Sequence, residues 1–242
     1  MENDIVPELL EKIKEDFFKA AESNAQLERL LLLLQNGEAT FLDAHEFSTI
    51  LGKLIAKSLK DNISSAVLPE GKMHYNIAER ILNDILGTNH NMVSSYSDRV
   101  QNVLNQKADI FLNSIKPKIN QDRIDGMINR LSYEEKFDDV AWMLDEPVVN
   151  FSNNVVDKFI KANAEFQYKA GLSAKIIRTS TGNCCEWCDA IAGTYTYPKV
   201  PKDLYRRHKN CDCVVEYFPA KGSENFGKHQ NSHTKKWVSD EI

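Results

Sequence analysis

The chain has 242 residues, 42% of them hydrophobic and 27% charged, and its formal net charge at pH 7 is −5. This composition excludes a disordered tail. The longest apolar runs, such as residues 30–34, are far shorter than the roughly 20 residues that a membrane-spanning helix needs. An acidic chain is also a poor general binder of nucleic acid, because phosphate neutralisation requires a clustered basic surface.

Helical periodicity dominates residues 1–171. Apolar residues recur there with a period near 3.6 and predict helices at residues 9–20, 27–34, 43–59, 75–86, 92–115, 122–131, 133–144 and 148–169. Asp43 is the predicted N-cap of the third helix, with Glu46 completing a capping box. We expect Asn36-Gly37, Gly87, Pro117 and Ala170-Gly171 to end the helices that precede them. His45, His74 and His90 have no partner at metal-ligand spacing, so we expect no chemistry from them.

The pattern changes after Gly171. Short runs rich in β-branched and aromatic residues predict strands at residues 175–180, 194–197 and 213–218, the last ended by Pro219. The predicted fold class is therefore α+β, with a mainly helical N-terminal region at 1–171 and a small β-rich, metal-binding module at 172–219. Residues 220–242 are polar and are expected to form an extended tail.

Cysteine placement gives the strongest functional signal. All five cysteines lie between Cys184 and Cys213, and none occurs earlier in the chain. The start of the chain, residues 1–4, is acidic and is not followed by an apolar stretch, so we expect no secretory signal and a chain made in a cytoplasm. In that setting a local cysteine cluster indicates metal binding or redox chemistry, not a disulfide scaffold.

The spacing of these residues indicates two metal-binding half-sites. Cys185 and Cys188 form a C-x-x-C pair, and His208 and Cys211 repeat the same offset after a 19-residue gap. Cys213 lies two residues beyond Cys211, so in a strand both side chains point to one face. We predict one structural Zn²⁺, bound by Cys185, Cys188 and Cys211 with either His208 or Cys213 as fourth ligand. The ion would replace a core too small to hold the module by itself, and Cys184 would point away from it.

Other readings of the same residues stay open. A thioredoxin-like redox pair needs its C-x-x-C after a strand in a βαβ unit. A cysteine nucleophile with His208 as base needs a third, orienting residue, which is not evident. An HNH-type nuclease could use Asn210 but lacks a catalytic histidine pair. The thiols could also be buried and reduced without any metal.

The cysteine-containing segment resembles the C-terminal module of phage minor head proteins, the phage Mu F-like or head morphogenesis proteins of tailed phages and prophages in Gram-positive bacteria. That family's signature is a C-x-x-C, a glycine, and then H-x-x-C-x-C leading into a strand. The matching positions here are Cys185, Cys188, Gly193, His208, Cys211 and Cys213. Further likeness lies in residues 122–126, 146–151, 163–171, 178–195, 205–217 and 230–237. The resemblance therefore covers roughly residues 92–237, which include a long-helix part at 91–171, whereas residues 1–90 match only loosely, as a variable part.

This resemblance implies a minor capsid protein, not an enzyme. Such proteins are portal-associated or lie at the inner capsid face, are assembled into the virion in the host cytoplasm, and act in head morphogenesis, DNA packaging or ejection. The implied partners are the portal protein, the major capsid protein or both, with no membrane and no small-molecule substrate. Arg206, Arg207 and Lys209 could touch packaged DNA, or they are ordinary solvated charges.

The alternative is a phage-encoded enzyme with a structural zinc site, either a nuclease or an ADP-ribosyltransferase-like toxin. Arg178 and Ser180 resemble elements of such transferases, but no E-x-E or Q-x-E follows a downstream strand. We therefore expect no catalytic residues.

Overall fold

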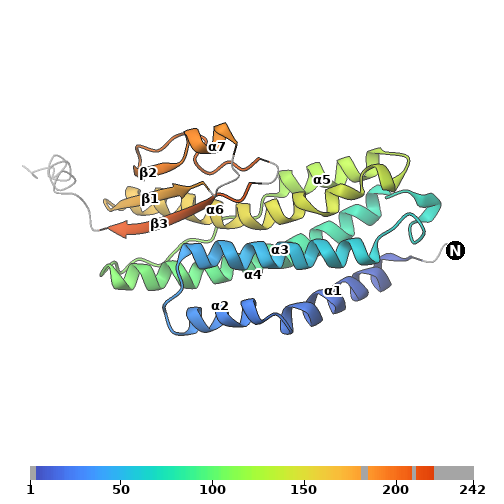
Figure 1. Cartoon of the computed structure of the whole chain (residues 1–242), viewed down its shortest axis with the longest axis horizontal. Coiled ribbons are helices and arrows are strands. Elements are labelled where there is room, and N and C mark those ends of the chain that lie inside the picture. The colour runs from blue at the N-terminus through green and yellow to red at the C-terminus, as the bar shows by residue number, and fades with distance from the viewer. Residues whose placement is uncertain (1–3, 181–184, 209–210, 221–242) are drawn as a thin grey trace, which may run out of the picture.

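The computed structural model describes residues 4–180, 185–208 and 211–220. Its helices form an elongated bundle, and a three-stranded sheet lies on one flank near one end (Figure 1). The elements are α1 (Val6–Glu22), α2 (Ala25–Gln35), α3 (Phe41–Asn62), η1 (Pro69–Gly71), α4 (Tyr75–Lys107), α5 (Gln121–Tyr133), η2 (Phe137–Asp139), η3 (Ala141–Leu144), α6 (Glu146–Lys169), β1 (Ser173–Thr179), α7 (Glu186–Ala190), β2 (Gly193–Thr196) and β3 (Val214–Ala220). The predicted α+β fold, helical first and β-rich near the C-terminus, is confirmed. Within the described residues, no helix is both long and apolar enough to cross a bilayer.

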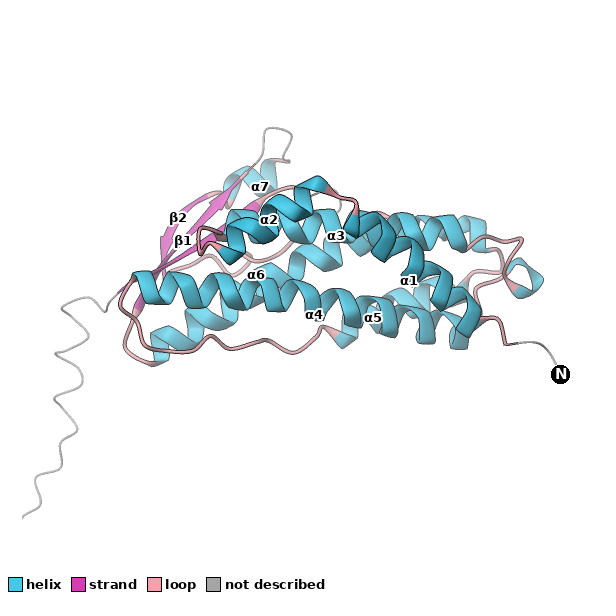
Figure 2. Ribbon diagram, turned by 90° about the horizontal axis from the view of Figure 1, so that it is seen from below, coloured by secondary structure: helices cyan, strands magenta, loops and turns pink. Residues whose placement is uncertain are grey.

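Helices α3, α4 and α6 run alongside one another at the centre of the bundle, and α1 and α2 cover the side away from the sheet (Figures 1 and 2). The approach of α3 to α6 is closest at Gly52. A Cβ atom on Gly52 would lie 2.9 Å from the Cα of Val149 and 3.0 Å from the Cβ of Ser152. Glycine is therefore required there because two helix backbones meet, not because of an unusual backbone angle.

A buried polar seam fixes how the three central helices align. The Ser48 hydroxyl on α3 donates to Oδ1 of Asn153 at 2.6 Å, and the Ser152 hydroxyl on α6 donates back to the carbonyl of Ser48 at 2.6 Å. Nδ2 of Asn89 on α4 reaches the Ser152 hydroxyl at 3.1 Å. Buried polar groups strongly prefer to be hydrogen-bonded, so sliding any one of these helices would leave several of them unpaired.

The sheet has strand order β2-β1-β3 with antiparallel pairing throughout. Ala174 and Ile176 on β1 and Val215 and Tyr217 on β3 are buried, and they belong to the same hydrophobic core as the helices. The Tyr217 ring meets Phe41 of α3 edge-on, with 6.0 Å between ring centroids. The inner face of the sheet is therefore packed directly on the bundle.

The predicted start of the third helix was wrong by one turn. Thr40 is the N-cap, and both its backbone N–H (2.8 Å) and its hydroxyl (2.7 Å) donate to Asp43, which occupies the third helical position. Glu46 instead pairs with Arg29 of α2 at 2.6 Å. Two overlapping cap patterns are present in the sequence, and the earlier one is used because Phe41 and Ala44 must also be buried.

The prediction of two helices at 75–86 and 92–115 was also wrong. They form one continuous α4, since a buried stripe including Ile81, Ile85, Val93 and Val100 continues through Gly87. A single glycine costs a helix only about 1 kcal/mol. The helix then ends at Lys107, eight residues before the predicted end. A segment without regular structure follows and is fixed to α6, where the amide of Asn163 bonds both the N–H and the C=O of Ile115 at 2.9 Å each.

Two smaller predictions need correction. The helix predicted at 133–144 is not formed: Tyr133 ends α5, and the 3-10 turns η2 and η3 lie within residues 137–144. The buried Phe137, Val140 and Met143 are three residues apart, a spacing that fits a 3-10 turn as well as a helix. Strand β3 continues through Pro219 because it lies at the sheet edge, where a missing N–H is tolerated. The predicted helix ends at Gly37 and Gly171 are confirmed, both with positive φ.

Replacing Gly87 or Gly52 with alanine should change the free energy of unfolding in opposite directions. Gly87→Ala should raise the free energy of unfolding by about 0.5–1 kcal/mol, because an added Cβ meets nothing within 4 Å and the helix interior gains propensity. Gly52→Ala should lower it by about 1–3 kcal/mol through the clash with α6. Urea unfolding followed by circular dichroism measures both. A shift of the same sign in the two variants would contradict the described helix contact.

Candidate metal centre

The pairing of β1 with β3 brings the two predicted half-sites together. Thr179 at the end of β1 is paired with Val214 at the start of β3. The chain leaving β1 therefore leads to Cys185 and Cys188 at the same end of the sheet at which Cys211 and Cys213 enter β3. The 19 residues between the half-sites include β2, which adds to the far side of β1.

A short helix, α7, presents the first half-site. Cys185 is its N-cap residue and Cys188 lies within it, so the C-x-x-C pair opens a helix. The sheet beside it is antiparallel. The βαβ context required by a thioredoxin-like pair is thus not found in the described residues. Cys184, predicted to point away from the metal, lies outside them.

All five predicted ligand residues come together in two overlapping groups that share Cys188. One group is Cys185, Cys188 and His208, and the other is Cys188, Cys211 and Cys213; within each group the ligand atoms lie within 4.8 Å of one another. The Sγ of Cys188 is 2.8 Å from Nε2 of His208 and 3.8 Å from the Sγ of Cys211. Two thiolates bound tetrahedrally at about 2.3 Å from zinc would be about 3.8 Å apart. The Cys188–Cys211 pair is therefore already spaced as two ligands of one ion would be, but no four of the five ligand atoms all lie within 4.8 Å of one another, so a single tetrahedral ion requires the two groups to move closer together.

Burial disfavours deprotonation of these thiols unless a cation lies close to them. Cys188, Cys211 and Cys213 are buried in a small cluster with Trp187 packed against it, while Cys185 is exposed. Burial raises the pKa of Cys188 to about 11. The backbone N–H of Cys188 lowers the pKa of Cys185. A metal ion reverses the penalty on the buried sulfurs because it binds the deprotonated form.

A buried ion pair joins the second half-site to the helices. Arg207, directly before His208, donates through Nε and Nη2 to the carboxylate of Asp157 on α6, the second contact at 3.1 Å. Its Nη1 donates to the carbonyl of Cys211 at 3.1 Å. The side chains of Arg207 and Asp157 are 2% and 0% exposed. The prediction that Arg207 is a surface charge was therefore wrong, because its guanidinium is buried and is paired with the Asp157 carboxylate.

His45 of α3 completes this junction, although the sequence suggested that it had no partner. Its Nδ1 lies 3.2 Å from Nη2 of Arg207. A guanidinium can only donate, so Nδ1 accepts, and this assigns the hydrogen to Nε2, which lies 3.0 Å from the carbonyl oxygen of Val215 and 3.2 Å from its amide nitrogen. Burial, and then the neighbouring Arg207, lowers the pKa of His45 to about 4. The imidazole is thus neutral and connects α3 to β3.

Four residues were not predicted to lie at the cysteine cluster: His45, Asp157, Arg207 and also Arg178, whose Nη2 is 3.7 Å from the Sγ of Cys211. Only Arg178 left a local signal, because it follows Ala174 and Ile176 on alternate positions of β1 and so belongs to the buried face. His45 and Asp157 are far from the cysteines in the sequence, and nothing in their neighbours indicates the contact. Of the other basic residues, Arg206 is exposed and pairs with Asp203 at 3.3 Å, and Lys209 lies outside the described residues.

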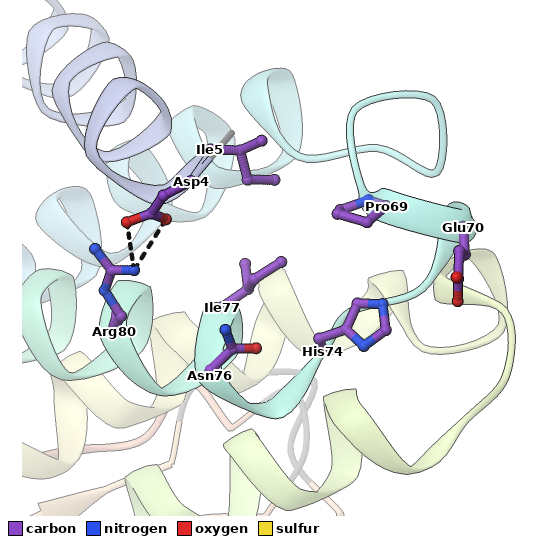
Figure 3. A pocket seen from close by; sticks show the side chains of 8 residues that line it. All are labelled: Asp4, Ile5, Pro69, Glu70, His74, Asn76, Ile77 and Arg80. Atoms are coloured by element: carbon purple, nitrogen blue, oxygen red, sulfur yellow. Dashed lines mark hydrogen bonds and ion pairs between the residues drawn. The ribbon is translucent and has the colours of Figure 1, made fainter. Parts of the chain in front are cut away.

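A hollow lies at the end of the bundle opposite the cysteine cluster, near residue 4. It has a volume of about 660 Å³ and is open to solvent (Figure 3). Arg80 on its wall is bound by the Asp4 carboxylate, with both oxygens 2.9 Å from Nη1. The side chain of His74 points toward Pro69 and away from this pair. Arg80 and Asp4 in this hollow are thus paired with each other, and the cysteine cluster is the better candidate for a functional site.

Comparison with known proteins gives no independent assignment. No protein-family description, characterised protein or solved structure matches this chain significantly. The functional argument therefore rests on the residues themselves.

The neutral, buried His45 predicts a specific pH dependence of stability. Its folded pKa of about 4 lies below the ordinary value of 6.5, so the unfolded chain takes up the proton first as the pH falls. The stability is fully present above pH 6.5 and should decrease by roughly 3 kcal/mol as the pH falls to 4.

The variant His45→Gln should lack this part of the decrease. Chemical unfolding of both proteins between pH 7.5 and 4 measures it, and the informative quantity is the difference between the two curves. Both chains carry the same cysteine cluster, so proton competition for a metal affects both alike. Parallel curves would show that His45 does not titrate as described.

Proposed function

We propose that this chain is a minor structural protein of a tailed-phage head, associated with the portal or the inner capsid face, and that it binds one structural Zn²⁺ ion. The observation that supports this most directly is spatial. The residues matching the cysteine and histidine positions of the minor head protein signature, separated by up to 28 positions in the sequence, form one cluster. Such clustering is expected if the sequence resemblance reflects a shared module.

Zinc is the metal that fits these donors best. Sulfur and imidazole ligands suit zinc, and a tetrahedral ion needs four of the five available groups. The buried position of three of the cysteines leaves little room for a substrate to reach the ion, and a closed site is typical of structural zinc. In this role the ion fixes α7 to the segment before β3, where only a few apolar residues support the chain.

The helical body would make the contacts with other head proteins. Helix faces with exposed leucines are a common docking surface, and Leu31 and Leu32 on α2 are 44% and 52% exposed. They border an apolar hollow of about 560 Å³ between α1, α2, α3 and α4. Contact with packaged DNA, if present, would involve Arg206 and not Arg207, whose charge is already paired with Asp157.

The zinc assignment predicts about one zinc per purified chain by elemental analysis. Cys188→Ser and Cys211→Ser should lose the metal, because each removes a buried ligand. Cys184→Ser is the matched control and should retain it, as the adjacent Cys185 is the one drawn into the cluster. A metal-free wild-type protein, folded and with all its thiols freely reactive, would exclude the zinc site.

The structural role predicts that the protein is present in mature virions. Quantitative mass spectrometry of purified particles should detect it in a few copies relative to the major capsid protein, and affinity purification from infected cells should recover the portal protein with it. Absence from particles and from portal complexes would contradict the proposal. Metal-dependent nicking of DNA by the purified chain would favour the nuclease alternative instead.

A further inference from the structure

Arg178 is a buried cation placed against the metal site. It lies on the inner face of β1 and is 2% exposed. Its Nη2 is 3.8 Å from the Sγ of Cys188 and 3.7 Å from the Sγ of Cys211. Its guanidinium also lies over the ring of Trp187, 5.6 Å from the centroid. Arg178 thus touches both half-sites, although it belongs to neither.

The charge of Arg178 needs a counter-charge. A guanidinium stays protonated in a protein, and a buried charge is costly unless it is paired. Its other hydrogen-bond partners in the described structure are the carbonyl oxygens of Leu204 and Arg206, the latter at 3.1 Å. None of these groups is a carboxylate, and neutral thiols would leave the positive charge uncompensated. Metal-bound thiolates at Cys188 and Cys211 would compensate it.

The size of the counter-charge distinguishes the ligand sets. Zn²⁺ with two thiolates and two neutral ligands has no net charge, with three thiolates and one histidine it has −1, and with four thiolates −2. One guanidinium balances a charge of −1. The other buried cation nearby, Arg207, is already balanced by Asp157, so a second negative charge on the centre would be unpaired.

We propose that Arg178 is the charge-compensating positioning residue of the metal centre, and that its ligands are Cys185, Cys188, Cys211 and His208. This inference rests on the metal site proposed above. In this arrangement Cys213 is a buried neutral thiol beside the ion. Arg178 acts in two ways: Nη2 donates to two ligand sulfurs, while Nη1 holds the 204–206 turn that leads to His208. Loss of the side chain therefore weakens both the charge balance and the placement of the histidine.

The primary test measures zinc affinity by competition with a chelator in the full-length protein. Arg178→Met should bind zinc about 10–100-fold more weakly, the usual effect of removing a group that hydrogen-bonds metal ligands. Arg178→Lys keeps the charge without the planar fork and should recover part of the loss. Arg206→Met is the matched control, because this neighbouring arginine is exposed, and it should bind zinc like the wild type.

A spectroscopic test separates charge compensation from a merely structural role. In the cobalt(II)-substituted protein, sulfur-to-metal charge-transfer absorption reports the number and electron density of the thiolates. Loss of the N–H···S contacts in Arg178→Met should move this absorption to lower energy, whereas loose packing alone would only weaken binding. Cys213→Ser should leave the absorption intensity and the metal content unchanged, and His208→Ala should change the spectrum.

The outcomes are distinguishable. Wild-type protein that binds zinc, with unchanged affinity and spectrum in Arg178→Met, would overturn the role of Arg178 while the metal site stands. A decrease in charge-transfer intensity in Cys213→Ser would overturn the three-thiolate ligand set. A wild-type chain that binds no metal would remove the proposed site itself. If Arg178→Met does not fold, the zinc affinity and the cobalt spectrum of Arg178→Lys test the proposal instead. Wild-type values for both quantities in Arg178→Lys would contradict the role of the Arg178 contacts with the two sulfurs.

Discussion

The buried pairing of Arg207 with Asp157 is the interaction on which the C-terminal half of this structure depends. Removing one partner of such a pair typically costs about 3–5 kcal/mol, because the other charge is left buried alone. Here the arginine lies directly before His208 and also holds the carbonyl of Cys211. The chain that carries the second metal half-site is therefore fixed to α6 by a strong constraint, and through His45 to α3.

Two buried arginines thus define the region in different ways. Arg207 has a carboxylate partner and connects the sheet to the helices, whereas Arg178 faces the sulfur cluster and connects the two halves of the metal site. Burial of either guanidinium would be energetically unfavourable without a negative group beside it. Arg207 holds the second half-site against α6, and Arg178 contacts one cysteine from each half-site. The three buried cysteines form a small cluster of their own, separate from the main apolar core.

Much of the helical architecture could be predicted from periodicity, and the exceptions have physical causes. Gly87 did not end α4 because the apolar stripe continues past it and a single glycine costs little. Residues 137–144 contain 3-10 turns where a helix was predicted, because a three-residue spacing of buried side chains fits either kind of helix. The earlier of two cap patterns starts α3 because Phe41 has to reach the core. In each case local sequence offered two solutions, and packing chose between them.

The sequence by itself identified the candidate ligands, because cysteines and a histidine at paired spacing, confined to one short stretch, are typical of a metal site whatever the fold. It also determined the three described strands and most of the long helices in their order, because hydrophobic periodicity is a local property. The tertiary structure alone decided which residues surround the site. Asp157 and His45 lie 50 and 162 positions from Arg207, and no local pattern records such a contact, since it arises only when α3, α6 and β3 pack together. The burial of Arg178 beside two sulfurs has the same origin.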